Sequence, residues 1–315
     1  MSKSLNRDAV VSLVVLLLGL ASPLVASEKW PIETAMEATF EVSPGGELRV
    51  EVPDADLELK TGSSNRVSIE VTLGGRDLDR ARAVFEKMDF RASASDGGVN
   101  LEADAIRTAW FSTHRGGYSI TVTIELPERF DIDLRTSDGD ISLESLDGSL
   151  SLKSSDGDIV IGRLQTSRAK VATSDGDIEI REIVATSLVE LHTSDGDVLI
   201  DTADGGEIEI RTSDGDIEVR ELSGALNARS GDGDISIGAD RFDDTSLSTN
   251  DGDITIRLAD GAGADVDVRG EEIIVRSGLR LEGTRSDGSA RGTINGGGSK
   301  LEASSGDGTV TITSR

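Results

Sequence analysis

From Asp131 to the C-terminus, apolar and polar residues alternate in short runs that recur along the chain. Isoleucine, leucine and valine occupy every second position, as at Ile178 and Ile180 or Val189 and Leu191. A period of two is that of a β-strand, whose successive side chains point to opposite faces, and it excludes a helix of the same length. The string TSDGDI or a close variant separates the runs, so the pattern predicts two short strands per repeat, one on each side of this string.

The repeat has a nearly constant length. The first Asp of the string falls at positions 138, 156, 175, 195, 214, 232 and 251, which gives a unit of about 19 residues. Weaker copies at Gly270, Asp287 and Asp307 predict that the period continues to the end of the chain.

Such a unit is too small to bury its apolar face alone. Stacked in register, successive units align their apolar positions into a continuous core, with strands about 4.8 Å apart. The predicted fold class is therefore all-β: a parallel β-solenoid of about 19-residue two-strand coils. A β-sandwich is the competing architecture, but its hairpins do not require a fixed period. The glycine inside each TSDGDI string is expected to turn the chain with a positive φ, which a residue without Cβ adopts readily.

Residues 28–130 are less regular than the repeats that follow. Alternating runs over 48–52 and 67–73 predict strands, and Asp77 is a suitable N-cap for a short helix that carries Leu78, Val84 and Met88 on one face. The string DADLEL at 54–59 resembles a degenerate first coil. We therefore predict an N-terminal β-rich cap region with one short helix over 28–130 and the solenoid over 131–315.

The first residues are typical of an export signal. Lys3 and Arg7 precede an apolar run from Ala9 to Ala21, and Ser27 ends a stretch suited to signal-peptidase cleavage. We expect a signal peptide over 1–27, cleavage after Ser27, and no membrane span in the mature protein; an uncleaved anchor is the alternative. The expected location is outside the cytoplasm, in the periplasm, at the cell surface or in the extracellular medium.

Net charge limits the classes of partner, and the absence of cysteine limits the interactions that can stabilise the fold. The formal net charge is −27, which argues against nucleic acid as a partner. It suits either an exported protein kept soluble by its charge or one that binds cations or basic partners. Cysteine is absent, so neither a lipid-anchored cysteine nor a disulfide is expected, and sheet ladders and the stacked core must stabilise the fold.

The carboxylates on both sides of the corner glycine form the one constellation that suggests chemistry. A structural interpretation is that they accept hydrogen bonds from backbone N–H groups of the turn. The alternative is calcium, because stacked corners align like charges that a hard cation would relieve. No known calcium-loop pattern accompanies them, so no cofactor is predicted and calcium stays open. The weak metal candidates are Asp138, Asp140, Asp156, Asp158, Asp175, Asp177, Asp195, Asp197, Asp214, Asp216, Asp232, Asp234, Asp251 and Asp253.

The sequence also bears on two further functions. A polysaccharide-active β-helix enzyme needs a cleft, but the repeats contain one aromatic residue, Phe242, and no long insertion. His192 falls in an outward column with Arg135, Lys153, Arg211 and Arg229, which is more typical of a solvated face than of a general base. No catalytic residue is predicted, and we expect no enzyme activity. The Thr and Ser residues that open each string could also form a hydroxyl ladder for ice or mineral binding.

Several features together resemble a bacterial family known as putative adhesins, β-solenoid domains of uncharacterised function. They are the DADLEL string, the strand from Ile120 to Pro127, the TSDGDI array and the closing stretch from Gly292 to Gly298. The resemblance implies a cell-envelope or secreted location and no known catalytic residues. The resulting hypothesis is a non-catalytic exported cell-envelope or surface protein of adhesin type, with an envelope, surface or polysaccharide partner. The alternatives are a calcium-binding repeat protein and a polysaccharide-active enzyme.

Overall fold

The computed structural model describes residues 30–95, 97–106, 117–276 and 278–315, so the predicted signal peptide lies outside the described residues. These residues form strands that are mostly parallel, together with one helix, as the sequence predicts. The chain divides into two compact units, Met1–Ser142 and Leu143–Arg315, and each is described by itself.

The first unit contains an antiparallel layer and the helix. Strand β4 (Arg66–Gly75) pairs on one side with β1 (Ile32–Glu41) and on the other with β7 (Tyr118–Pro127), both antiparallel. Helix α1 (Leu78–Met88) follows β4, and the side chain of Asp77 accepts a hydrogen bond from the Arg80 backbone N–H. The predicted helix and its N-cap are thus confirmed.

Parallel pairing begins within the same unit. Strand β2 (Glu47–Glu51) lies between β6 (Gly98–Glu102) and β8 (Asp131–Arg135), parallel to both, and β3 (Asp56–Gly62) runs parallel to β7. Strand β5 (Arg91–Ser95) completes the set as the antiparallel partner of β6. The Val52 backbone N–H donates to Arg135 O at 3.1 Å, and that of Leu57 to Asp140 O at 2.8 Å. The DADLEL segment therefore stacks on the first TSDGDI corner as a coil, as predicted.

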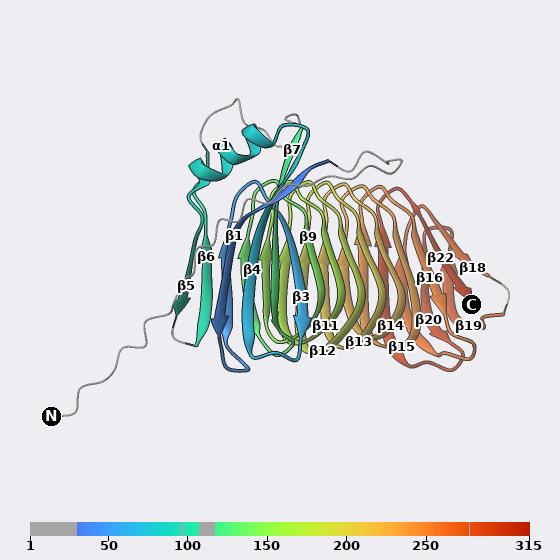
Figure 1. Ribbon diagram of the computed structural model, residues 1–315. Helices are drawn as coiled ribbons and strands as arrows, with labels where there is room; N and C mark the ends of the chain where they lie inside the picture. Colours follow the sequence, from blue (N-terminus) through green and yellow to red (C-terminus); the bar gives the residue numbers. More distant parts are fainter. Residues whose placement is uncertain (1–29, 96, 107–116, 277) are drawn as a thin grey trace, which may run out of the picture. The chain divides into compact units, whose positions relative to one another are not determined.

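The second unit is a solenoid-like stack of parallel strands, in which the ladder from β11 to β15 is regular (Figure 1). Ile178 pairs with Ile159 on one side and with Val198 on the other, and equivalent positions pair in each following strand. The boundary between the units falls within β9 (Ile141–Asp147). The other strands up to β16 are β10 (Leu150–Lys153), β11 (Ile159–Ala172), β12 (Ile178–His192), β13 (Val198–Arg211), β14 (Ile217–Arg229), β15 (Ile235–Thr249) and β16 (Ile254–Leu258).

The two short strands predicted per repeat are joined into one. Strand β12, for example, has 15 residues and runs from the position after one corner to the position before the next. Its register to β13 shifts between Val184 and Leu188, and similar shifts occur in the neighbouring pairs. An extra residue in one strand is accommodated there as a bulge, which explains why repeats of 18 to 20 residues stack with their corners aligned.

The core of the second unit follows the predicted columns. Ile178, Ile180, Val189 and Leu191 are at most 1% exposed, while Glu179 and Glu190, which alternate with them, face outward. Burying each such side chain stabilises the fold by about 1.5–3 kcal/mol.

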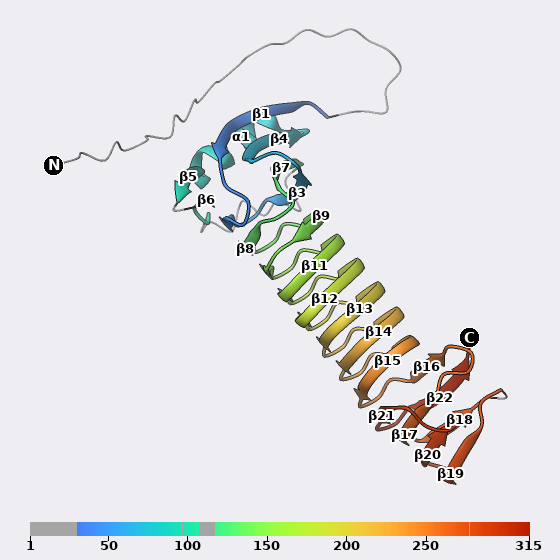
Figure 2. The same cartoon turned by 90° about the horizontal axis from the view of Figure 1, so that it is seen from below.

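The C-terminal end corrects the predicted order of coils. Strand β21 (Ser299–Ser305) lies between β15 and β17 (Ala264–Arg269), and β22 (Thr309–Ser314) lies between β16 and β18 (Glu272–Val275), all parallel. The last coil in sequence is therefore inserted one place earlier in the stack, as Figure 2 shows at the orange and red end of the chain.

Asp287 marks no coil at all. It lies in the turn between β19 (Leu281–Ser286) and β20 (Ser289–Ile294), an antiparallel hairpin whose second strand pairs with β17. The prediction of an unbroken period to the C-terminus was wrong, because a strand-like pattern shows that a segment can join the stack but not which neighbours it takes.

The assignment of faces yields a stability prediction. Replacing Ile178, which is fully buried, with Asp should lower the free energy of unfolding by several kcal/mol, since it buries a charge without a partner. Replacing the exposed neighbour Glu179 with Ser should have little effect. Denaturant unfolding of both variants measures the difference, and equal losses of stability would contradict the assignment.

Candidate functional site

The hydroxyl groups that open the corners are buried, and those from Thr173 to Thr249 bond one coil to the next, whereas Thr136 Oγ1 has no partner among the described residues. Thr193 Oγ1 donates to Gly176 O of the preceding corner at 3.0 Å and accepts from the Gly196 backbone N–H at 3.2 Å. Thr212 and Thr249 make the same two bonds. The ice- or mineral-binding interpretation of this column is therefore wrong, because a hydroxyl that is buried and already paired cannot contact an external lattice.

The two carboxylates of each corner have different roles. Oδ1 of the second Asp accepts a hydrogen bond from the backbone N–H of the equivalent residue one coil further on, as Asp177 does from Asp197 at 2.8 Å. Oδ1 of Asp158, Asp197, Asp216, Asp234 and Asp253 accepts in the same way, at 2.7 to 2.9 Å. These bonds are to backbone amides, as the structural interpretation expected, but to those of the next coil. Among the described residues the first Asp of each corner in the second unit, such as Asp175, is exposed and has no side-chain partner.

The corner glycines are required for a reason other than the predicted one. None of those in the described residues has a positive φ, whereas Gly205 and Gly206, in the strand bends, do. A Cβ atom on Gly215 would lie 1.9 Å from Gly196 O of the preceding coil. The glycine thus permits close stacking of two backbones, and the predicted left-handed turn was wrong.

The metal candidates do not converge on one point. In the ranges that the structure describes, no group of three or more Asp, Glu, His or Cys side chains has an arrangement that could hold a metal ion. The fourteen Asp candidates are instead distributed one pair per corner. Calcium binding at these corners stays a prediction.

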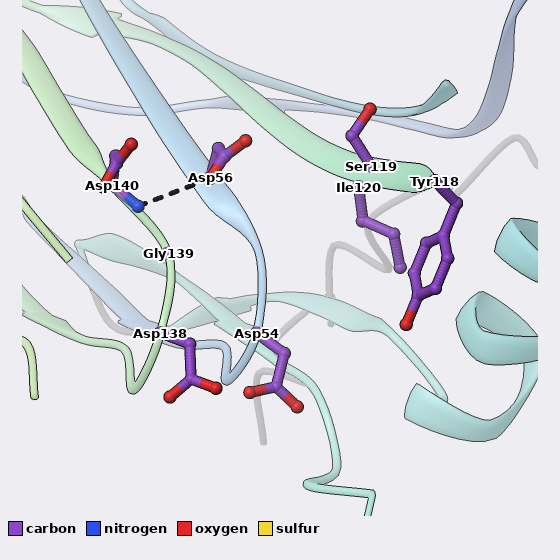
Figure 3. Close-up of a pocket in the computed structure, with 8 residues that line it drawn as sticks. All are labelled: Asp54, Asp56, Tyr118, Ser119, Ile120, Asp138, Gly139 and Asp140. Carbon is purple, nitrogen blue, oxygen red and sulfur yellow. Dashed lines mark hydrogen bonds between the residues drawn. The ribbon is translucent and has the colours of Figure 1, made fainter. Parts of the chain in front are cut away.

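A distinct acidic pocket of about 200 Å³ lies in the first unit, where the DADLEL corner meets the first TSDGDI corner (Figure 3). Asp54 and Asp138 face each other there, while Asp56 Oδ1 accepts from the Asp140 backbone N–H at 3.4 Å. The sequence prediction named Asp138 and Asp140 but missed Asp54 and Asp56. The signal was available, since DAD at 54–56 is the degenerate copy of DGD at 138–140.

The electrostatics of this pocket favour a proton on the acid pair. Partial burial of Asp54, followed by the charge and the hydrogen bond of Asp138, raises the pKa of Asp54 above its usual value. Asp54 also has φ = 55°, a left-handed conformation that Asp tolerates better than most residues. Tyr118, also in the pocket, is 6% exposed, and burial raises its pKa. The arrangement can hold a proton between two carboxylates.

The outward basic column is present as predicted within the second unit. Lys153, Ala172, His192, Arg211 and Arg229 follow one another in register, and Arg135 holds the equivalent position before Thr136 in the first unit. His192 is exposed, and its Nδ1 lies 3.2 Å from Arg211 O. His114 lies outside the described residues.

Stacked parallel coils with glycine corners and an inserted last coil define a solenoid-like β-protein. The chain belongs to the Toastrack family DUF4097, whose model matches residues 45–313. This membership confirms the resemblance to the adhesin-type family. Comparison with curated proteins gives no match.

Several solved structures are similar to this chain. A putative adhesin from Bacteroides fragilis has 17% sequence identity and a TM-score of 0.49, with 74% of this chain and 98% of that chain covered. A putative lipid binding protein from Parabacteroides distasonis has 13% identity and a TM-score of 0.48, covering 87% and 95% of the two chains. A putative adhesin from Parabacteroides merdae has 12% identity and a TM-score of 0.45, with 91% and 97% covered.

The described residues also bear on membrane insertion. Helix α1 has 11 residues, and none of the helices formed by these residues has the length and apolar character needed to cross a bilayer.

The corner ladder predicts an asymmetry between the two carboxylates. Asp177→Ala removes the acceptor for the Asp197 N–H and should cost about 1 kcal/mol of unfolding free energy, whereas Asp177→Asn keeps an acceptor and should be close to neutral. Asp175→Ala is the matched control and should also be close to neutral. Thermal melts with chelator and with excess calcium complete the test. A calcium-dependent rise in melting temperature that both alanine variants abolish would show that the corners bind metal.

The acid pair predicts a pH-dependent stability. Because the pKa of Asp54 is raised in the folded protein, its contribution is most favourable below the unfolded value of 3.8 and is lost as the pH rises through the folded pKa. Asp54→Asn, a neutral mimic that also tolerates positive φ, should therefore raise the melting temperature at pH 7, and the gain should shrink as the solution is acidified. Asp232→Asn, at an exposed corner position, is the control. A gain that does not vary with pH would contradict the raised pKa of Asp54.

Proposed function

We propose that the mature protein is a non-catalytic, exported cell-envelope or surface protein of adhesin type, with a binding or structural role. The observation that carries this proposal is the use of the repeated polar groups. Thr193 Oγ1 and Asp177 Oδ1, like their equivalents, are engaged in bonds between coils. The motif that looked most like chemistry thus builds a scaffold, with coils of about 19 residues as the register of Ile159 to Ile178 supports.

A scaffold of this kind repeats the same outward side-chain positions in every coil. Each outward position recurs at every coil, about 4.8 Å from its neighbour, so an outward column forms a straight row of side chains. A row suits an extended partner with its own repeat. Polysaccharides and other envelope polymers have this property, and they are the class of partner we favour.

Calcium binding is the second candidate, and one observation favours it. The first Asp of each corner in the second unit is exposed and has no side-chain partner among the described residues, so it could take up a cation. The melts with chelator and calcium described above decide between these two roles.

Export and binding can be tested on the same material. The exported protein should begin at Glu28, as measured by N-terminal sequencing, and should fractionate with the envelope or the medium. The purified mature protein should bind peptidoglycan, envelope polysaccharide or cationic peptides in pull-down assays and should release no products from the polysaccharides. Exported material that retains Met1 would contradict cleavage, and turnover of a polysaccharide would favour the enzyme class.

A further inference from the structure

A polar groove of about 370 Å³ lies on the outer face of the second unit. Its floor consists of Ser246 and Ser248 from β15 and Ser304 from β21. Arg229 of β14 and Arg269 of β17 stand at its two ends, three strand spacings or about 14 Å apart.

The groove arises from a change of residue type within two outward columns. Two coils earlier, in β13, these columns carry the long charged side chains of Glu209 and Arg211, which form an ion pair at 2.8 Å, and β14 carries Asn227 and Arg229. At β15 the same positions are Ser246 and Ser248. The surface is therefore lower there by the length of a charged side chain.

The inserted coil extends this floor. Ser248 pairs with Ser304, although 56 positions separate them in sequence, and Ser304 in turn pairs with Arg269. Without the insertion, β17 would not follow β21, and Arg269 would not close the groove. The site thus depends on the corrected order of coils.

Hydrogen-bonding capacity is left unused along the floor and at one end. Among the described residues, the hydroxyls of Ser246, Ser248 and Ser304 have no hydrogen-bond partners, and Arg229 has no ion pair.

The two carboxylates that line the groove are neutralised by neighbouring cations. Glu302 pairs with Lys300 at 2.7 Å, and Asp267 pairs with Arg291 and with Arg269. The hydrogen bond from Arg291 is the main cause of the lowered pKa of Asp267. With Arg229 and Arg269, the lining residues and their partners comprise four cations and two carboxylates. The groove is thus a locally basic site on an acidic protein.

We propose that this groove binds a segment of an acidic glycan, laid across β14, β15, β21 and β17. This inference rests on the proposed function and names its partner class. Arg229 and Arg269 would engage carboxylate or phosphate groups of the glycan, for which the guanidinium fork is suited. The serine hydroxyls, which both donate and accept, match the hydroxyls of the sugars between them.

The test measures binding of the mature protein by titration calorimetry to three named probes. Oligogalacturonate supplies carboxylates, polyglycerol phosphate supplies phosphates, and methyl-esterified galacturonan supplies the sugar chain without charge. We expect binding to one or both acidic probes, weakened by salt, and much weaker binding to the ester. Tighter binding of oligogalacturonate would indicate that the groove prefers carboxylates, and tighter binding of polyglycerol phosphate that it prefers phosphates.

Variants then locate the site. Arg229→Ala should weaken binding about tenfold, the loss expected for one charge-assisted contact. Ser248→Glu, which fills the floor and adds a negative charge, should abolish it. Arg211→Ala is the matched control, because it lies in the same column outside the groove and is already paired with Glu209. Unchanged melting temperatures would show that the variants fold.

Three results would overturn the inference: no preference for acidic probes over the ester, equal losses for Arg229→Ala and Arg211→Ala, or equally tight binding of polyglutamate, which has the charge but no sugar. These outcomes are separate from failure of the proposed function. If the parent and Ser248→Glu bind isolated envelope polysaccharide equally well, the proposed function holds and the groove is not its site. If the parent binds no envelope component, both proposals fail.

Discussion

The close approach of one corner to the next is the constraint on which the rest of the second unit depends. A Cβ atom at Gly176, Gly196 or Gly215 would lie 1.9 to 2.1 Å from the carbonyl oxygen of the preceding corner, so only glycine permits this spacing. The threonine hydroxyl and the aspartate oxygen then bond the two corners at short range. Because these contacts leave no room for a slip of one residue, they fix the register along both sides of the coil, and with it the alignment of the buried columns.

The same corners concentrate negative charge, and the structure shows how this is tolerated. Two like charges about 5 Å apart repel by about 1 kcal/mol in water. The corner carboxylates of the second unit are exposed to solvent, which screens them, and the second Asp of each pair gains a backbone N–H donor. At Asp54, where burial is greater, desolvation and the nearby charge of Asp138 raise the pKa instead. Solvent exposure therefore limits the cost of placing like charges on neighbouring corners.

The strand pattern, the mostly parallel sheet, the helix with its cap at Asp77 and the inward columns could all be predicted from the sequence, because each depends on local periodicity. The role of the corner glycine could not, since a positive φ and a close backbone contact both favour the same residue. The order of the last coils was also missed. The segments that form β17 and β21 both carry strand-like patterns. The alternation of apolar and polar residues does not show that Ser248 of β15 pairs with Ser304 of β21, 56 positions further on.

The candidate sites, too, could be predicted only where a local sequence motif marks them. Asp138 and Asp140 were found from a repeated motif, whereas Asp54 was missed because its copy of the motif is degenerate. The serine floor was missed because serine in an outward column is unremarkable until its neighbours are known. It becomes a groove only beside Arg229 and Arg269, and Arg269 reaches it through the inserted coil.

The inserted coil has a consequence for the order in which the protein can be assembled. Strands β15 and β16 find their final neighbours only in residues 299–314, which follow β17 and β18 in the sequence. Earlier coils can form from residues that are near in sequence, but β17 and β18 have no native place until β21 and β22 have docked. Until residues 299–314 have docked, the edge formed by β15 and β16 stays open.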